Sequence, residues 1–235
     1  FCPGNAVADT VMKAIAPAVP KQVSAGIGNL RVMAFSGVTN NAPWVHMEIM
    51  EGAYGGRYGK DGMDAVDTLY ANTRNNPIED IESHLPLRVL NYELRENVAG
   101  PGASRGGIGS IRSFELLEDG AVSIEGDGQR FDPWGFLGGA DGSPAKVELV
   151  QARGATVELP SKLPYRHLSK GDRITAYGPC GGGYGDPLER EPQAVLDDVL
   201  DGLIDAASAR ADYGVVVNGQ GVDEAATREL RAGRT

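Results

Sequence analysis

The sequence predicts an α+β fold in which a β-rich middle, about 110–177, lies between helices near 5–16 and 191–211. Short apolar segments separated by turn residues predict the strands of the middle. Apolar residues spaced four apart predict the two flanking helices. The 33 glycines among 235 residues are about twice the ordinary share, and they follow no fixed period, which excludes collagen-like and solenoid repeats.

The first helix is indicated by Val7, Val11 and Ile15, which repeat every four residues until Pro17 ends the segment. A glycine-rich loop at 51–62 then follows a predicted strand, and such a loop on a rigid scaffold is suited to ligand contact. The elements predicted before residue 99 are a strand within 22–38, strands at 44–50 and 87–94, and a short helix at 78–82.

Turn sequences at 118–120 and 153–154 each separate two apolar segments of the middle, as in β-hairpins. The four-residue spacing of Val195, Val199 and Leu203 predicts the second flanking helix. The strands predicted here are 111–117, 121–125, 147–150, 155–159 and 173–177, followed by a short strand at 213–217 and a helical tail at 222–231. We therefore divide the chain into an α/β region (1–98), a β-rich region (99–187) and a C-terminal helical tail (188–235).

The charge balance excludes several classes of function. Lys and Arg number 22 against 32 Asp and Glu, a net charge of −10, which argues against a nucleic-acid binder and against a polybasic membrane anchor. No apolar run is long enough to span a bilayer, and the N-terminal residues lack the features of a signal peptide. The two cysteines, Cys2 and Cys180, are too few for a disulfide framework, which favours a cytoplasmic location.

Metal, thiol and nucleotide sites are each weakly indicated. His46, His84 and His167 have no metal-binding spacing, so no metal site is expected in this chain. Cys180 lacks a nucleophile-elbow pattern and is better explained as a small side chain in a tight turn. The glycine cluster at 181–185 lacks the Lys-Ser or Lys-Thr of a phosphate loop, which favours a structural turn over a nucleotide site.

A dense set of polar residues surrounds the first glycine loop and suits the orientation of a polar substrate such as an amide or a carboxylate. The alternative is a solvated loop whose charges pair with one another. The set comprises Glu48, Glu51, Arg57, Lys60, Asp61, Asp64, Asp67, Asn72, Arg74 and Asn75.

Short motifs that follow one another along nearly the whole chain carry a family resemblance. They are Gly4-Asn5-Ala6-Val7-Ala8-Asp9-Thr10; Tyr54-Gly55-Gly56-Arg57 with Asp61-Gly62-Met63-Asp64; Asn72-Thr73-Arg74-Asn75-Asn76-Pro77; Gly100-Pro101-Gly102 with Arg105-Gly106-Gly107; Arg130-Phe131-Asp132-Pro133-Trp134-Gly135; and Gly181-Gly182-Gly183-Tyr184-Gly185-Asp186-Pro187. In this order they resemble the C-terminal half of the B-type subunit in the hydantoinase B/oxoprolinase family.

The resemblance implies an enzyme that works as part of a multi-chain complex. Members pair an ATP-binding hydantoinase A-type subunit with the B-type subunit, and together these open cyclic amides such as hydantoins, 5-oxoproline and lactams. Related complexes carboxylate ketones such as acetone and acetophenone, which is the first alternative. A second alternative is a non-catalytic half that supports a site on partner chains. Cyclic amide hydrolysis is favoured because that branch of the family is broader.

The resemblance also implies where the site and its cofactors lie. Glu48, Arg57, Asp61, Asn72 and Arg74 are expected to line a substrate pocket, while the catalytic residues are not identified. The family's metal-binding motifs, of His-x-x-Asp and His-His-x-Asp type, do not occur here. ATP with Mg²⁺ and a divalent metal are therefore expected on the A-type subunit or on the N-terminal half of the B-type subunit. We expect this chain to be a continuous part of a larger subunit in a hetero-oligomer.

Overall fold

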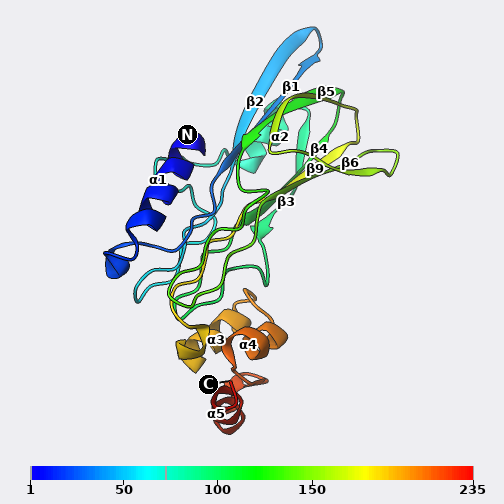
Figure 1. The fold of residues 1–235 in the computed structure, drawn as a ribbon. Coiled ribbons are helices and arrows are strands. Elements are labelled where there is room, and N and C mark those ends of the chain that lie inside the picture. Colours follow the sequence, from blue (N-terminus) through cyan, green and yellow to red (C-terminus); the bar gives the residue numbers. More distant parts are fainter. Residues whose placement is uncertain (1, 72, 235) are drawn as a thin grey trace.

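The computed structural model describes residues 2–71 and 73–234. Two antiparallel β-sheets lie towards one end, extended glycine-rich segments run from them through the middle, and short helices gather at the other end (Figure 1). The N-terminal helix α1 (Cys2–Ile15) lies beside the extended segments. Within the described ranges, no helix has the length and apolar character that a membrane span requires.

Each sheet is antiparallel throughout, with the strand orders β2-β1-β5-β8 and β3-β4-β9-β6-β7. The first sheet contains β1 (Arg31–Thr39), β2 (Ala42–Met50), β5 (Gly120–Gly126) and β8 (Lys162–Leu168). The second contains β3 (Leu87–Leu94), β4 (Ser110–Leu116), β6 (Lys146–Val150), β7 (Thr156–Glu158) and β9 (Arg173–Tyr177). Strands from before and after residue 98 thus combine in both sheets.

The hydrophobic core lies between the two sheets. Met33 and Phe35 of β1 share one buried cluster with Phe114 of β4 and Ile174 of β9. The rings of Phe35 and Phe114 have centroids 5.1 Å apart and are tilted by 48°, a favourable arrangement for two aromatic rings. The short helix α2 (Ile78–His84) adds Ile81 to this cluster. Burying each such side chain stabilises the fold by about 1.5–3 kcal/mol.

Most predicted strands are confirmed, because alternation along a half-buried strand is a strong local signal. Those predicted at 44–50, 87–94, 111–117, 121–125, 147–150, 155–159 and 173–177 correspond to β2, β3, β4, β5, β6, β7 and β9. Sequence reasoning missed β8, whose alternation is interrupted by Pro164. Proline is accepted there because β8 is an edge strand with a neighbour on one side only.

The glycine-rich segments 51–62, 99–109 and 178–187 form a bundle of extended segments rather than separate loops. The amides of Cys180 and Gly183 donate to the carbonyls of Ser143 and Ala140, so two residues three apart bond to one neighbouring segment. The amides of Gly181 and Tyr184 donate in the same way to Gly107 and Ser104 of another segment. A three-residue repeat is characteristic of the polyproline II helix, which has no hydrogen bonds within itself. Here the backbone of the segment forms hydrogen bonds to several neighbouring segments instead.

Glycine is required in this bundle because the backbones approach one another too closely for side chains. A Cβ atom on Gly181, Gly182 or Gly183 would lie 2.1, 2.1 or 1.9 Å from the carbonyl oxygen of a neighbouring segment. The tight turn expected at 181–185 is therefore wrong: the segment is extended and mostly buried. Its amides already donate to protein carbonyls, so they are not available to cradle a phosphate.

The C-terminal region contains short helices instead of the single helix expected near 191–211. Gly202 adopts a positive φ of 74°, and the side chain of Asp205 then caps a new helix by accepting from the amide of Ser208 at 2.7 Å. The predicted strand at 213–217 is largely wrong for a similar reason, since Gly214 ends a helix at φ 63°. The elements are α3 (Pro192–Leu200), α4 (Ala206–Tyr213), β10 (Val217–Asn218), β11 (Gly221–Val222) and α5 (Glu224–Ala232).

Candidate functional site

The guanidinium of Arg112 is the centre of a buried polar cluster between β2, β3 and β4. Arg112 is 1 % exposed and donates to Glu48 Oε2 at 2.6 Å, while its nearest approach to a carboxylate oxygen of Glu51 is 3.8 Å. It also lies 4.3 Å from the centre of the Tyr92 ring, a cation–π contact. A buried charge is tolerated only when it is paired, and Glu48 supplies that pair.

Glu51 is the other carboxylate of this cluster, and hydroxyl groups from two strands hold it. Ser110 Oγ donates to Glu51 Oε2 at 3.1 Å, and Tyr92 Oη donates to Glu51 Oε1 at 3.3 Å. Burial raises the pKa of Glu51, because removing water disfavours the charged form. Burial, followed by the neighbouring Glu51 charge, raises the pKa of Tyr92 to about 12.

A cleft of about 370 Å³ opens beside Glu51, between the end of β2 and the segment 63–75. Its volume lies within the range of pockets that bind small molecules. Its lining residues are Glu51, Tyr54, Met63, Ala65, Val66, Asp67, Ala71, Thr73 and Asn75.

A second cleft, of about 300 Å³, is lined by Arg57 and Asp61 and shares Tyr54 and Met63 with the first. The exposed guanidinium of Arg57 forms no ion pair with any other described side chain, so it is available to an anionic group. The ammonium of Lys21 lies 4.5 Å from the centre of the Tyr58 ring in the same wall. This cleft therefore offers positive charge, in contrast to the first.

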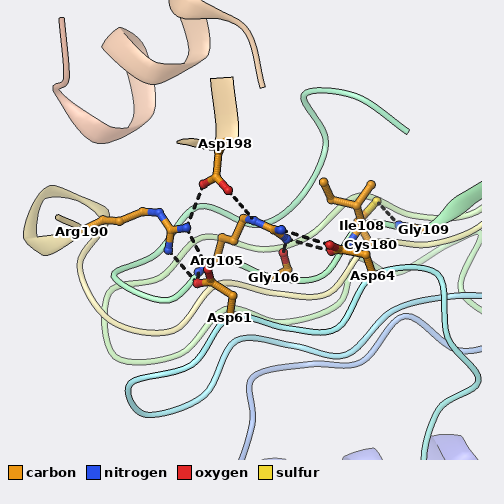
Figure 2. A network of polar contacts seen from close by, with 9 residues as sticks. All are labelled: Asp61, Asp64, Arg105, Gly106, Ile108, Gly109, Cys180, Arg190 and Asp198. Carbon is orange, nitrogen blue, oxygen red and sulfur yellow. Dashed lines mark hydrogen bonds and ion pairs between the residues drawn. The ribbon is translucent and has the colours of Figure 1, made fainter. Parts of the chain in front are cut away.

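Asp61 and Asp64 take part in an ion-pair network that joins α3 to the bundle (Figure 2). Arg190 donates to both oxygens of Asp61 at 2.6 and 2.8 Å, and Arg105 donates to both oxygens of Asp64 at 2.8 and 3.1 Å. Asp198 of α3 accepts from both arginines, at 3.2 and 2.8 Å. Burial opposes ionisation of Asp61, but the bonds and charge of Arg190 outweigh it and lower the pKa of Asp61.

The five residues expected to line one substrate pocket lie in different surroundings. Glu48 is buried against Arg112, whereas Arg57 and Asp61 line the second cleft. Arg74 is exposed and has no ion pair with the other described residues, and Asn72 lies outside the described residues.

Sequence reasoning missed the partners that organise these carboxylates: Arg105, Arg112, Arg190 and Asp198. Arg112 did leave a signal, since it is a charged residue inside an apolar strand at a position that alternation assigns to the core. Charged residues are almost never fully buried unless they are paired. The other three lie in loops or on a helix, where charge is ordinary and carries no such signal.

The three histidines and Cys180 are not gathered into one cluster in the described part of the chain. No group of three or more His, Cys, Asp and Glu side chains there has an arrangement that could hold a metal ion. His46 is buried with Nε2 at 3.8 Å from Glu48, whereas His84 and His167 are exposed. Cys180 is fully buried in the extended bundle, where its Sγ accepts from the Gly109 amide at 3.3 Å and burial raises its pKa.

The profile of the family described as hydantoinase B/oxoprolinase matches residues 1–187. The chain belongs to the hydantoinase B/oxoprolinase family. This confirms the resemblance that its ordered motifs indicate. Both sheets and the extended bundle lie within the matched range, and the helices from α3 onward lie beyond it.

Three similar proteins are named for different reactions. A Pseudomonas sp. (strain NS671) protein, provisionally named as the B component of a D-/L-hydantoinase, is 60% identical over 98% of this chain and 39% of its own length. The beta component of the caprolactamase of Pseudomonas jessenii is 31% identical over 98% of this chain and 42% of its own length. The acetone carboxylase alpha subunit of Xanthobacter autotrophicus is 31% identical over 63% of this chain and 24% of its own length.

Solved structures of related enzymes share this fold. The crystal structure of ATP-dependent caprolactamase from Pseudomonas jessenii superposes on 93% of this chain with a TM-score of 0.80 and 28% identity, covering 40% of that chain. The nucleotide-free acetone carboxylase superposes on 93% with a TM-score of 0.77 and 23% identity, covering 34% of that chain. This hydantoinase B/oxoprolinase chain spans about two fifths of the length of the bacterial hydantoinase and caprolactamase proteins that it matches.

Proposed function

We propose that this chain is the C-terminal part of the B-type subunit of an ATP-dependent cyclic amide hydrolase. The observation that carries the proposal is the 60% identity, over nearly the whole chain, to a protein provisionally named as the B component of a hydantoinase. The similarity to caprolactamase supports it, because hydantoins and caprolactam are both cyclic amides. An amide resists hydrolysis through resonance, so coupling to ATP would activate its carbonyl oxygen.

The complex would be a hetero-oligomer located in the cytoplasm, where ATP is abundant. ATP with Mg²⁺ would bind to a hydantoinase A-type subunit, and a divalent metal would bind there or on the rest of the B-type subunit. The relatives named as subunits support this assembly. Ketone carboxylation is the second candidate. The similarity to the acetone carboxylase alpha subunit supports it, and that similarity covers a smaller part of this chain.

Reconstitution tests this function. The chain would be produced with the remainder of its B-type subunit and with an A-type subunit, and the purified complex would be given ATP with hydantoin, 5-oxoproline, caprolactam or acetone plus bicarbonate. We expect release of ADP that depends on a cyclic amide and matches the ring-opened product. ADP release that depends only on ketone and bicarbonate would establish the carboxylase instead, and a complex active on neither would leave the chain a structural part.

We further propose that the segment 48–76 handles substrate, with Arg57 and Arg74 holding an anionic group such as a carboxylate or a phosphate. Glu48 and Asp61 would then orient the rest of the ligand directly or through their arginine partners. Asn72 would offer a donor and an acceptor to the ring amide. In the reconstituted complex, Arg57→Ala should lower kcat/KM about tenfold or more, because a charged hydrogen bond is worth about 1.5–3 kcal/mol. Arg153→Ala, in an exposed hairpin turn, is the matched control and should stay within about twofold.

A further inference from the structure

Two carboxylates share one guanidinium in the buried cluster, and they share it unequally. Glu48 lies 2.6 Å from Arg112, whereas the oxygen of Glu51 lies 3.8 Å away, beyond hydrogen-bond distance. The positive charge of Arg112 is therefore largely matched by Glu48. Glu51 is left without an ion pair at hydrogen-bond distance. Its partners are the hydroxyls of Ser110 and Tyr92, which can serve either its ionised or its neutral form, and the side-chain amide of Asn75.

The cleft of about 370 Å³ opens onto Glu51, and Glu48 is not among its lining residues. Besides Glu51, the polar lining consists of Asp67, Thr73 and Asn75, and no Lys, Arg or His lines the described wall. Both the amide and the hydroxyl of Thr73 donate to Asp67 Oδ2. Asp67 Oδ1 is buried and has no hydrogen-bond partner among the described residues. A buried acceptor left unpaired is costly, so this wall favours a ligand that brings N–H groups and no negative charge.

We infer that this cleft binds the neutral ring of a cyclic amide and that Glu51 is the catalytic residue that exchanges a proton with that ring. The inference rests on the proposed function and adds a site to it. A cyclic amide brings N–H donors for the acceptor-rich wall, and its carbonyl can accept from a protonated carboxyl. Glu48 accepts from Arg112 and positions its guanidinium.

The groups around Glu51 favour a proton at this position. Burial is the largest influence and raises the pKa of Glu51, while Arg112 and Ser110 act in the opposite direction. Tyr92 of β3 donates to Glu51, and Glu48 of β2 pairs with the neighbouring Arg112. Asp67 lines the same cleft as Glu51. A carboxyl whose surroundings favour its neutral form is suited to act as a general acid.

The proton exchange balances without a further reactant beyond water and the ATP-dependent activation of the ring. Water first adds to the carbonyl carbon of the activated ring and forms the new C–O bond. As the ring C–N bond then breaks, its electron pair goes to nitrogen, which takes the proton of the Glu51 carboxyl, and the added water gives a proton back to the Glu51 carboxylate. The carbonyl oxygen keeps the phosphoryl group received from ATP, and a second water releases that group as inorganic phosphate and leaves the free carboxylate. Glu51 therefore ends each turnover protonated, as it began.

The first test is Glu51→Gln in the reconstituted complex. We expect kcat for ring opening to fall about a hundredfold or more, the usual share of acid–base catalysis, with KM within about threefold. Glu93→Gln, on the exposed face of β3, is the matched control and should leave both constants unchanged. A Glu51→Gln complex that assembles and keeps kcat within about threefold overturns the inference.

A milder variant guards against loss of folding. Ser110→Ala removes one donor to Glu51, so the carboxylate is less stabilised and the high-pH limb of kcat should move to higher pH by about half a unit. Ser123→Ala, which removes a hydroxyl bond to Pro164 in the other sheet, is its control. An unmoved limb in Ser110→Ala overturns the role of Glu51 while cyclic amide hydrolysis stands; an unsubstituted complex that opens no ring overturns the proposed function itself.

Discussion

Gly182 shows how strictly single residues determine the extended bundle. Its amide donates to Gly26 and its carbonyl accepts from Gly56, so it bonds to two different segments. A Cβ atom there would lie 2.1 Å from the oxygen of Trp134, and the obstacle is backbone, which cannot rotate away. We expect Gly182→Ala to destabilise the chain by more than about 4 kcal/mol, beyond the ordinary range for one substitution, or to prevent folding. Chemical denaturation measures the change.

The control for this substitution is Gly4→Ala in α1. An added Cβ there would meet only the Tyr70 ring at 3.6 Å, an ordinary contact, and alanine favours a helix over glycine. We expect a free energy of unfolding equal to or above that of the unsubstituted chain. Equal effects of the two substitutions would mean that close backbone approach does not explain the glycines.

Single residues also show what the sequence could predict about the site. Glu48, Arg57 and Asp61 stand out because their segment is dense in charge, and the structure places the last two at one cleft. Their arginine partners were not predictable, since Arg190 lies 129 positions from Asp61 and no local pattern reports so distant a pairing. Glu51 was only one carboxylate among several until the fold showed that it is buried at a cleft.

At the scale of elements, local signals predicted strands well and predicted the association of segments poorly. The partial alternation of 87–94 identified β3 with its observed ends, although only Leu87 is buried and Val89 half-buried along it. Glycine clusters were visible, but glycine permits turns and close packing alike. Only the partner segments decide between these uses, and they lie far away in the chain, as Gly107 does from Gly181.

The docking of α3 depends on Arg190, which joins it to the bundle through Asp61 and Asp198. We expect Arg190→Gln to destabilise this contact by on the order of 2–3 kcal/mol, less than for a fully buried pair because Asp61 is partly exposed. Hydrogen exchange should then be faster in α3 and α4 and unchanged in the sheets. Arg228→Gln, which affects an exposed pair at 3.9 Å, is the control and should leave exchange unchanged.

The same contact should depend on pH. Because the pKa of Asp61 is lowered in the folded chain, its contribution is fully present above the ordinary aspartate pKa of about 3.9 and is lost as the pH falls through the lowered value. Exchange in α3 should therefore rise at strongly acidic pH in the unsubstituted chain and much less in Arg190→Gln. Equal pH dependence in both would show that Asp61 does not hold this helix.

At the scale of the whole molecule, apolar residues face outward in two places. On α1, the periodic residues Val7, Val11 and Ile15 are exposed, while the opposite side buries Cys2 and Asn5. On the first sheet, Val45 and Met47 of the edge strand β2 are 72% and 64% exposed. The helix and strand were predictable from their spacing, but which face meets the protein was not, because either face of a periodic pattern can be the covered one.

We expect this outward apolar surface to make the chain self-associate when it is produced alone. Exposed apolar patches and free strand edges both promote contact between molecules, and β2 carries both features at one edge of the sheet. Val45→Thr together with Met47→Thr keeps residues that suit a strand while removing apolar surface, so it should lower the weight-average mass measured by sedimentation at micromolar concentration. Leu90→Thr with Leu94→Thr on β3, where exposure is only 38% and 37%, controls for a general loss of apolar area and should have the smaller effect. A monodisperse monomer of the unsubstituted chain at tens of micromolar, with a sharp melting transition, would contradict this expectation, since the exposed face would then need no cover.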